Sequence, residues 1–256
     1  MVSIIILNYK TKGLLKNCLN SIYRYTSDLN FEIIVVDNNS KDGSGKMLKK
    51  IFPKIKFIQT KKNLGFSAGN NLGIKKAKGK YLIIINPDTT LIENSFKKMR
   101  DFMEEHKNIA VIGPQLINPN RSIQYTRCNF PEFLMPVYRR SFLQKINYFK
   151  NKIDLYLTKD KDYNQIMKTD WIFGACLFIR KEALDKVGFL DEKFFLGFED
   201  VDLCRRFWQA GYEVWYFPQT KIIHYPHRFS KKGLLDKTIR IHIASWFKYF
   251  WKYRKK

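Results

Sequence analysis

The stretch "KYLIIINPDTT" (residues 80–90) decides the fold assignment. It contains a continuous apolar run rich in isoleucine, which is typical of a strand that is buried on both faces of a parallel sheet. The run ends at Asn86, Pro87 and Asp88, so one acid follows the strand directly. Taken alone, Asp88 is either a turn residue or a ligand for a metal ion. The surrounding sequence has to separate these alternatives.

Strands and helices alternate on the N-terminal side of this stretch. Two earlier apolar runs and a third short strand-like segment are joined by segments with helical spacing of apolar residues, as in Leu15, Leu19 and Ile22. This alternation predicts an α/β fold with a Rossmann-like, mostly parallel sheet that helices cover on both faces. We expect strands over residues 2–9, 31–40, 55–63 and 80–88, and helices over residues 14–26, 43–52, 67–79 and 95–106.

Polar residues follow the predicted strands, and ligands of such sheets bind outside the carboxyl ends of the strands. A carboxylate such as Asp37 can accept hydrogen bonds from a base N–H or from ribose hydroxyls. We therefore expect one crevice at this edge of the sheet. The polar residues are Asn8, Asp37 to Ser40, Asn63 and Asn86 to Asp88.

The stretch "NLGFSAGNNLGI" (63–74) leads into a predicted helix. Its small residues let the backbone approach a ligand, and a helix N-terminus favours phosphate. The spacing of Gly65, Gly69 and Gly73 does not match the dinucleotide-binding fingerprint, and no Walker loop is present. The stretch is therefore compatible with a phosphate ligand, but it is neither a dinucleotide-binding fingerprint nor a Walker loop.

The stretch "FEDVDLCRR" (198–206) contains Glu199, Asp200 and Asp202 at a predicted helix start. Acids at this position interact favourably with the helix dipole, which is one explanation. Three acids exceed what a helix start needs, however, and clustered carboxylates raise one another's pKa, as suits a general base. His224 follows at a strand end and is a candidate metal ligand.

The rest of the second half is less regular. Residues 128–166 contain helical pieces, prolines and many charges, and form either a lid or an acceptor-facing insertion. Residues 169–195 predict a strand, a turn and a short helix, and Gly211 ends the helix that follows, before further strands.

The chain is strongly basic: 47 lysines and arginines against 23 acids give a net charge of +24. Such a field attracts polyanions, namely nucleic acid, anionic lipid or phosphorylated substrates. Dispersed basic residues without a recognised module argue against nucleic acid as a partner. The first apolar run is too short for a signal peptide, and no stretch approaches the roughly 18 apolar residues that span a bilayer. We expect a cytoplasmic protein.

The C-terminal segment has two sides on a helical wheel. The pattern fits an interfacial helix that binds anionic lipid, or an ordinary terminal helix that packs on the domain. The apolar side carries Ile239, Ile243, Trp246, Phe247, Phe250 and Tyr253, and the basic side carries Lys237, Lys248, Lys252 and Lys255.

Six motifs in this order resemble the inverting glycosyltransferases of family 2, which have the GT-A fold. The resemblance runs from Val2 to about Tyr225. The later motifs are similar to those of bacterial rhamnosyltransferases and galactofuranosyltransferases, which build surface polysaccharides on lipid carriers. The motifs are "VSIIILNYK", "VVDNNSKDGS", "NLGFSAGNNLGI", "YLIIINPDTTL", "TDWIFGACLFIRKEAL" and "GFLDEKFFLGFEDVDLCRR".

The resemblance implies a donor site. Asp37 is expected to bind the nucleoside, with Asn8 nearby. Asp88 is expected to bind Mg²⁺ or Mn²⁺ on the donor diphosphate, and His224 to supply a second contact. Asn86 departs from the family's Asp-x-Asp pattern, but its amide oxygen is an acceptable neutral ligand. The residues expected to shape the nucleotide pocket are Asn63, Gly65 and Asn71.

The resemblance also implies a catalytic site. Asp200 matches the family's base, with Glu199 beside it, and Trp171 and Gly174 are expected to line the sugar and acceptor site. The expected domains are a GT-A domain over 1–235, divided into a nucleotide-binding half (1–110) and an acceptor-binding half (111–235), and a basic amphipathic helix over 236–256.

The expected reaction is transfer of rhamnose from dTDP-rhamnose to a lipid-linked or polysaccharide acceptor for the cell envelope, on the inner face of the cytoplasmic membrane. Galactofuranose or another UDP-sugar is the alternative donor. A nucleotidyltransferase is disfavoured, since "NYKTKGLLK" (8–16) contains one glycine and no arginine where a triphosphate loop needs both.

Overall fold

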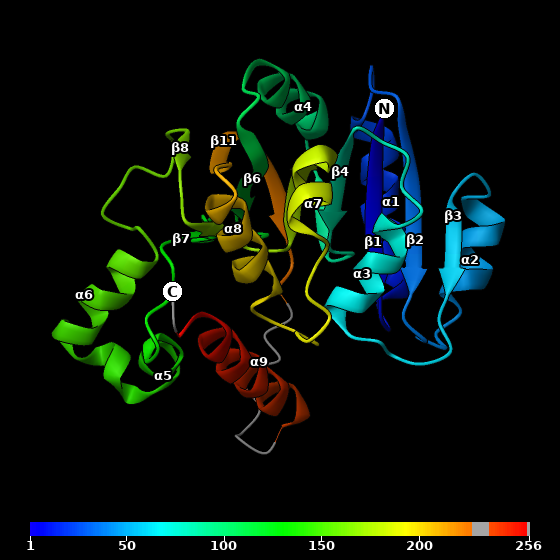
Figure 1. The fold of residues 1–256 in the computed structure, drawn as a ribbon. Coiled ribbons are helices and arrows are strands. Elements are labelled where there is room, and N and C mark those ends of the chain that lie inside the picture. Colours follow the sequence, from blue (N-terminus) through cyan, green and yellow to red (C-terminus); the bar gives the residue numbers. More distant parts are fainter. Residues whose placement is uncertain (227–235, 255–256) are drawn as a thin grey trace.

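The computed structural model describes residues 1–226 and 236–254 (Figure 1). Within these residues, nine strands form one sheet in the order β3-β2-β1-β4-β10-β6-β11-β5, with β8 paired to β11. The strands are β1 (Val2–Asn8), β2 (Phe31–Asp37), β3 (Lys56–Gln59), β4 (Tyr81–Ile85), β5 (Thr89–Leu91), β6 (Ile109–Ile117), β8 (Met167–Lys168), β10 (Cys176–Arg180) and β11 (Glu213–His224). A separate pair consists of β7 (Arg127–Cys128) and β9 (Trp171–Ile172).

The predicted parallel sheet is confirmed for the N-terminal half. β3, β2, β1 and β4 are neighbours and run parallel, so their carboxyl ends meet at one edge. The pairing places Asn8 of β1 beside Asp37 of β2, and Asp37 beside Gln59 of β3. β10 runs antiparallel to β4 and to β6, whereas β11 runs parallel to β6, so the sheet as a whole is mostly parallel.

Helices cover both faces of the sheet, as predicted (Figure 1). Both faces of β1 are apolar and need to be covered. Ile4 and Ile6 belong to one buried cluster and Ile5 to the other, because side chains alternate across a strand. The helices are α1 (Lys12–Tyr25), α2 (Ser44–Ile51), α3 (Phe66–Ile74), α4 (Ser95–Glu105), α5 (Met135–Arg140), α6 (Asn147–Tyr156), α7 (Lys181–Val187), α8 (Glu199–Gln209) and α9 (Lys237–Tyr253), with a 3₁₀ turn η1 (Phe142–Lys145).

Several boundaries differ from the predicted ones. The strand expected over 55–63 is the four-residue β3, and the helix expected over 67–79 ends at Ile74. No strand was expected for β6, although all nine of its residues are buried. Gly113 and Pro114 interrupt its apolar pattern, and Gly113 is needed because a Cβ there would lie 2.7 Å from the Ile172 side chain.

α9 packs on the domain partly through the predicted apolar side, which supplies Tyr253 and Phe250, and partly through neighbouring residues. Ser245, Tyr249 and Tyr253 are its buried residues, while Phe247 is 54% exposed. Lys252, expected on a solvated basic side, instead pairs with Asp191 and Asp202. Lys255 lies outside the described residues. The helix therefore contributes polar and aromatic side chains to the domain.

Candidate active site

A cavity of about 1050 Å³ opens at the carboxyl ends of β1 and β4. Its wall begins at Leu7 and Tyr9, continues through Asn86, Pro87 and Asp88, and reaches α5, α8 and α9 on the other side. This volume is at the upper end of the range for small-molecule sites. Among the predicted residues, the cavity brings together Asn63, Gly65, Asp88, Trp171, Gly174, Glu199, Asp200 and His224.

Asn8 and Asp37 lie behind this wall rather than in it. Asn8 Nδ2 donates to Asp37 Oδ1 at 2.7 Å, and Gln59 Nε2 donates to the other carboxylate oxygen at 2.7 Å. The backbone N of Ser40 donates to Asp37 as well, which fixes the loop that follows β2. The residue that this loop presents to the cavity is Asn38, one of the polar residues expected at this edge but not one that was assigned a role.

Asn38 and Asn63 hold the glycine-containing loop in place. Asn38 Nδ2 donates to Asn63 Oδ1 at 2.9 Å and to the backbone O of Gly65 at 3.1 Å. Gly65 has a φ of +86°, and a Cβ there would lie 2.6 Å from the backbone O of Phe195, so only glycine fits. This contact joins the nucleotide-side loop to the segment that precedes α8.

Asn71 is also placed outside the cavity. Its Nδ2 donates to the backbone O of Leu190 and to Glu192, and its Oδ1 accepts from the backbone N of Leu190. The residue therefore ties α3 to the loop after α7. It supports the pocket from outside its wall.

Asp88 and His224 form one edge of the cavity. They meet because β5, which starts directly after Asp88, pairs with the end of β11. His224 Nε2 lies 3.6 Å from Asp88 Oδ1. Gln124 Nε2 donates to the backbone O of His224, so its Oε1 is left to face His224 Nδ1 at 2.8 Å. This arrangement assigns the proton to Nδ1 and directs the Nε2 lone pair toward Asp88.

The donor set at this edge fits a divalent cation that also binds a ligand. The Asp88 carboxylate is the kind of oxygen ligand that Mg²⁺ and Mn²⁺ take, and an imidazole nitrogen is a common metal ligand that suits Mn²⁺ better than the harder Mg²⁺. Within residues 1–226 and 236–254, however, no three His, Cys, Asp or Glu side chains cluster tightly enough to hold a metal by themselves. The remaining positions are therefore open to phosphate oxygens and water.

Asp200 and Glu199 lie at the start of α8. Gly197 and Phe198 both have a positive φ, which turns the chain sharply into the helix. The backbone N atoms of Gly174 and Val201 donate to the Asp200 carboxylate at 2.8 and 2.9 Å. Gly174 thus orients the acid directly, since its N–H and missing side chain allow the close approach.

The two acids have raised pKa values. Loss of hydration raises the pKa of Asp200 to about 6, against the opposing effect of the two backbone N–H groups. Burial, and then the charge of Asp200, raises the pKa of Glu199 well above its ordinary range. Near neutral pH Asp200 is mostly ionised, which suits it for accepting a proton, whereas the raised pKa of Glu199 favours the protonated form of that acid.

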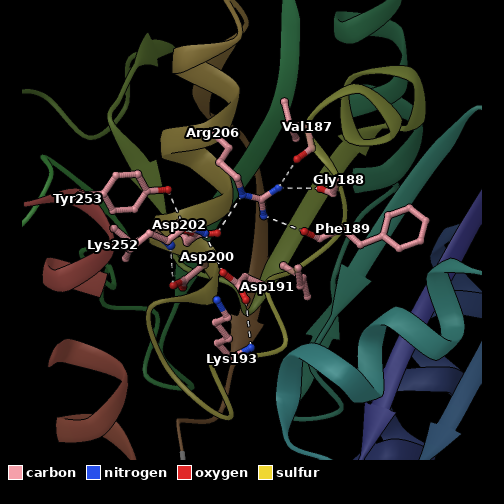
Figure 2. A network of polar contacts seen from close by, with 12 residues as sticks. Val187, Gly188, Phe189, Asp191, Lys193, Asp200, Asp202, Arg206, Lys252 and Tyr253 are labelled. Carbon is pink, nitrogen blue, oxygen red and sulfur yellow. Dashed lines mark hydrogen bonds and ion pairs between the residues drawn. The ribbon is translucent and has the colours of Figure 1, made fainter. Parts of the chain in front are cut away.

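Asp202 has a structural role instead (Figure 2). Its side chain is fully buried and lies 2.9 Å from Arg206 Nε and 2.6 Å from Lys252 Nζ, and it accepts a hydrogen bond from the Tyr253 hydroxyl at 2.8 Å. Arg206 also donates to the backbone O atoms of the loop after α7. Asp202 therefore joins α8 to α9, and the three acids do not act as one cluster.

Trp171 lines the cavity from β9. Its Nε1 donates to the backbone O of Asn129, and its ring stacks on Phe173 at 5.0 Å between centroids. A fixed aromatic wall of this kind can pack against a sugar face. Lining residues that the sequence did not indicate include Arg139, Arg140 and Gln144, which belong to the charged, irregular segment 128–166, and His242 of α9.

The chain matches known proteins in sequence. The family model described as "Glycosyl transferase family 2" matches residues 3–188. Rhamnosyltransferase WbbL of Escherichia coli is 27% identical over 97% of this chain and 92% of its own length. The uncharacterized glycosyltransferase YfnE of Bacillus subtilis is 30% identical over 94% of this chain and 68% of its own length.

A third relative is longer than the matched region. The N-acetylglucosaminyl-diphospho-decaprenol L-rhamnosyltransferase of Mycobacterium tuberculosis is 23% identical over 75% of this chain, and the match spans 66% of that protein.

The fold also matches solved structures. GalNAc-T7 with UDP, GalNAc and Mn²⁺ has a TM-score of 0.71 at 17% identity, covering 99% of this chain and 50% of that chain. The mannosyltransferase PcManGT of Pyrobaculum calidifontis with GDP-Man and Mn²⁺ has a TM-score of 0.61 at 15% identity, covering 89% of this chain and 58% of that chain. These likenesses establish the fold, a mixed α/β fold of the GT-A type.

Proposed function

The chain belongs to glycosyl transferase family 2, and from this we propose that it transfers a sugar from a nucleotide diphosphate to a hydroxyl of a lipid-linked or polysaccharide acceptor. One observation carries the proposal: a metal-compatible pair, Asp88 and His224, and a carboxylate with a raised pKa, Asp200, line the same cavity. Inverting transfer needs both, a place for the leaving diphosphate and a base for the acceptor.

The proposed reaction is a single displacement. Asp200 accepts the proton of the acceptor hydroxyl, and the oxygen forms a bond to the anomeric carbon. The bond from that carbon to the diphosphate oxygen breaks, and its electron pair leaves with the nucleoside diphosphate, so the anomeric centre is inverted. Bound Mg²⁺ or Mn²⁺ would neutralise charge on the leaving group. Protonated Glu199 remains beside Asp200 as a neutral neighbour.

We propose rhamnose from dTDP-rhamnose as the donor. The rhamnosyltransferases among the relatives support this choice. The alternative is galactofuranose or another UDP-sugar. In either case Asn38, Asn63 and Gly65 would face the nucleotide, with Asn8 and Asp37 supporting their loop from behind.

A panel of nucleotide sugars tests the donor. We expect dTDP-rhamnose with Mn²⁺ or Mg²⁺ to raise the melting temperature by about 5–10 °C at 100 times its Kd, because ligand binding to the folded state alone adds about 2.7 kcal/mol. Thermal shift with and without the cation is the measurement. A panel in which no nucleotide sugar stabilises the protein would contradict the proposed function.

We divide the domain into a nucleotide-binding half over 1–110 and an acceptor-binding half over 111–235, of which 227–235 lie outside the described residues. Residues of both halves line the cavity, as expected if the donor binds to the first half and the acceptor to the second. The segment 236–256 is proposed as a membrane-contacting helix that also contributes to the site, since Ile239 and His242 line the cavity.

We propose that the protein acts at an anionic membrane surface on the cytoplasmic side. In the part of the chain that the structure describes, no helix meets the length and apolarity needed to cross a bilayer. Support for surface contact comes from α9, whose Phe247 and Trp251 are 54% and 70% exposed. Aromatic side chains beside basic ones are typical of interfacial helices.

Removing these two aromatic side chains tests the membrane contact. We expect Phe247→Ser/Trp251→Ser to lower affinity for phosphatidylglycerol vesicles at least about tenfold, since two aromatic anchors lose their apolar burial. Vesicle co-sedimentation measures the change. Ile51→Ser on α2, which also removes an exposed apolar side chain, should leave binding unchanged. Equal binding by the double variant and the unmodified protein would refute the contact.

A further inference from the structure

Two adjacent arginines of α5, Arg139 and Arg140, line the cavity without an assigned role. Gln144 of η1 lies on the same part of the wall. In Figure 1, α5 is close to α9 and well separated from β4, whose carboxyl end leads to Asp88. The helix that carries the arginines therefore lies away from the strand end that leads to the edge proposed for the donor diphosphate.

No acid neutralises these two arginines among the described residues. Neither forms an ion pair there, although many basic side chains elsewhere do. The buried Arg127 and Arg180 are satisfied differently, mainly by backbone O atoms. Arg139 lies over the ring of Tyr156 at 5.3 Å and is hydrogen-bonded to the Tyr156 side chain. Because a guanidinium has five N–H donors, this one contact does not satisfy it. Two like charges next to each other are costly unless an anion binds them.

The titratable groups around Arg139 and Arg140 are consistent with a positively charged part of the cavity. Burial and the charge of Arg139 lower the pKa of Arg140. Burial and the charge of Arg140 lower the pKa of His242 to about 4, so that this facing histidine of α9 is neutral at pH 7. The carboxyls on the cavity wall are Asp88, Glu199 and Asp200, and burial raises the pKa of Glu199 well above its ordinary range. Among the described residues, no ion pair offsets the positive charge at α5.

The segment that carries the arginines is also apolar on its outside. Phe142 is 73% exposed, and Leu134 and Val137 are 45% and 39% exposed. Phe133, just before α5, packs against Trp246, Phe247 and Phe250 of α9, so this apolar surface adjoins α9. A ligand with an anionic group and a long apolar chain would match both features.

We propose that Arg139 and Arg140 bind the phosphate or diphosphate ester that joins the acceptor saccharide to its lipid. Arginine suits this task because its planar fork donates two hydrogen bonds to phosphate oxygens at once. The lipid chain would lie along the exposed apolar surface around Phe142, and the saccharide would extend into the cavity toward Asp200. This inference rests on the proposed function, since it assigns the anchor of that acceptor.

Farnesyl diphosphate, a short lipid diphosphate, is the probe. Titration calorimetry with dTDP or UDP and Mn²⁺ at saturation keeps the probe out of the donor site. We expect Arg139→Gln/Arg140→Gln to weaken farnesyl diphosphate binding at least about tenfold, because charge-assisted hydrogen bonds are lost. The matched control Lys145→Gln/Lys150→Gln removes the same charge from the same segment outside the cavity wall and should bind as the unmodified protein does.

Three further ligands identify the source of the anion. Inorganic pyrophosphate should bind more weakly but show the same dependence on the arginines, and farnesol should show none. Phosphatidylglycerol vesicles should bind equally to the arginine and lysine double variants. Arginine dependence confined to the vesicles would overturn the acceptor assignment in favour of a phospholipid headgroup.

Equal affinity of the arginine variant and the unmodified protein for farnesyl diphosphate would overturn the inference. Nucleotide binding by the same samples separates this failure from a failure of the proposed function. A variant that still binds dTDP or UDP is folded and has its donor site. An unmodified protein that binds neither nucleotide contradicts the proposed function itself, whatever the arginines do.

Discussion

Asp200→Asn is expected to lower kcat for sugar transfer by about 10²–10⁴-fold, the usual contribution of a positioned general base. An amide cannot take the acceptor proton, but it has nearly the same shape and can still accept a hydrogen bond from Gly174 or Val201. The donor site at Asp88 is built from other strands, so the donor Kd should change less than twofold. Initial rates and donor titration measure the two quantities.

The control for this change is Asp185→Asn, which replaces an exposed acid of α7 and should retain full activity. Glu199→Gln is informative beside it. Since burial raises the pKa of Glu199 and so favours its neutral form, the neutral amide should be tolerated better than at Asp200. Undiminished turnover by Asp200→Asn would remove this residue from the mechanism.

Asp88→Asn is expected to have the second large effect, a loss of metal-dependent donor affinity of about 100-fold or more. Asp88 is the proposed carboxylate ligand and His224, 3.6 Å away, the proposed second side-chain ligand, and metal stabilisation of a diphosphate is worth several kcal/mol. Without nucleotide, we expect Mn²⁺ to bind weakly even to the unmodified protein, because two side chains leave most coordination positions to phosphate and water.

Titration of the nucleotide sugar with Mn²⁺ and with EDTA measures the effect of Asp88→Asn. Gln124→Ala should have a smaller effect, because it removes only the residue that orients His224. We expect it to lower the metal-dependent affinity for the nucleotide sugar about 10–100-fold. An Asp88→Asn protein whose donor affinity still rises with Mn²⁺ as it does in the unmodified protein would show that the cation is held elsewhere.

The sequence predicted the strands correctly where their apolar runs are uninterrupted. β1, β2 and β4 lie within the predicted ranges, and their parallel pairing brings the predicted polar ends to one edge. It was insufficient for β6, since Gly113 and Pro114 interrupt the pattern and burial between β10 and β11 stabilises the strand regardless. Local propensity gives no information on such long-range pairing.

The sequence likewise predicted some features of the candidate site and not others. Asp88, Asp200 and His224 line one cavity, as the resemblance implied. Asp37 does not line this cavity: its carboxylate accepts hydrogen bonds from the two neighbouring strands, β1 and β3, and from Ser40 in the loop after β2. Its contact with the nucleoside stays a prediction. Sequence spacing could not reveal that Asp202 binds two side chains of α9, since Lys252 and Tyr253 lie about fifty positions away in the chain.

The most direct test of the central claim is the pH dependence of kcat/KM for transfer, measured at saturating donor. Only the ionised form of Asp200 can accept the acceptor proton, and the pKa of this carboxyl is about 6. The account predicts that kcat/KM is constant near neutral pH and falls about tenfold per pH unit below about 6, and that the residual activity of Asp200→Asn lacks this limb. A profile that is flat through pH 6, or an identical acid limb in Asp200→Asn, would contradict the assignment of Asp200 as the base.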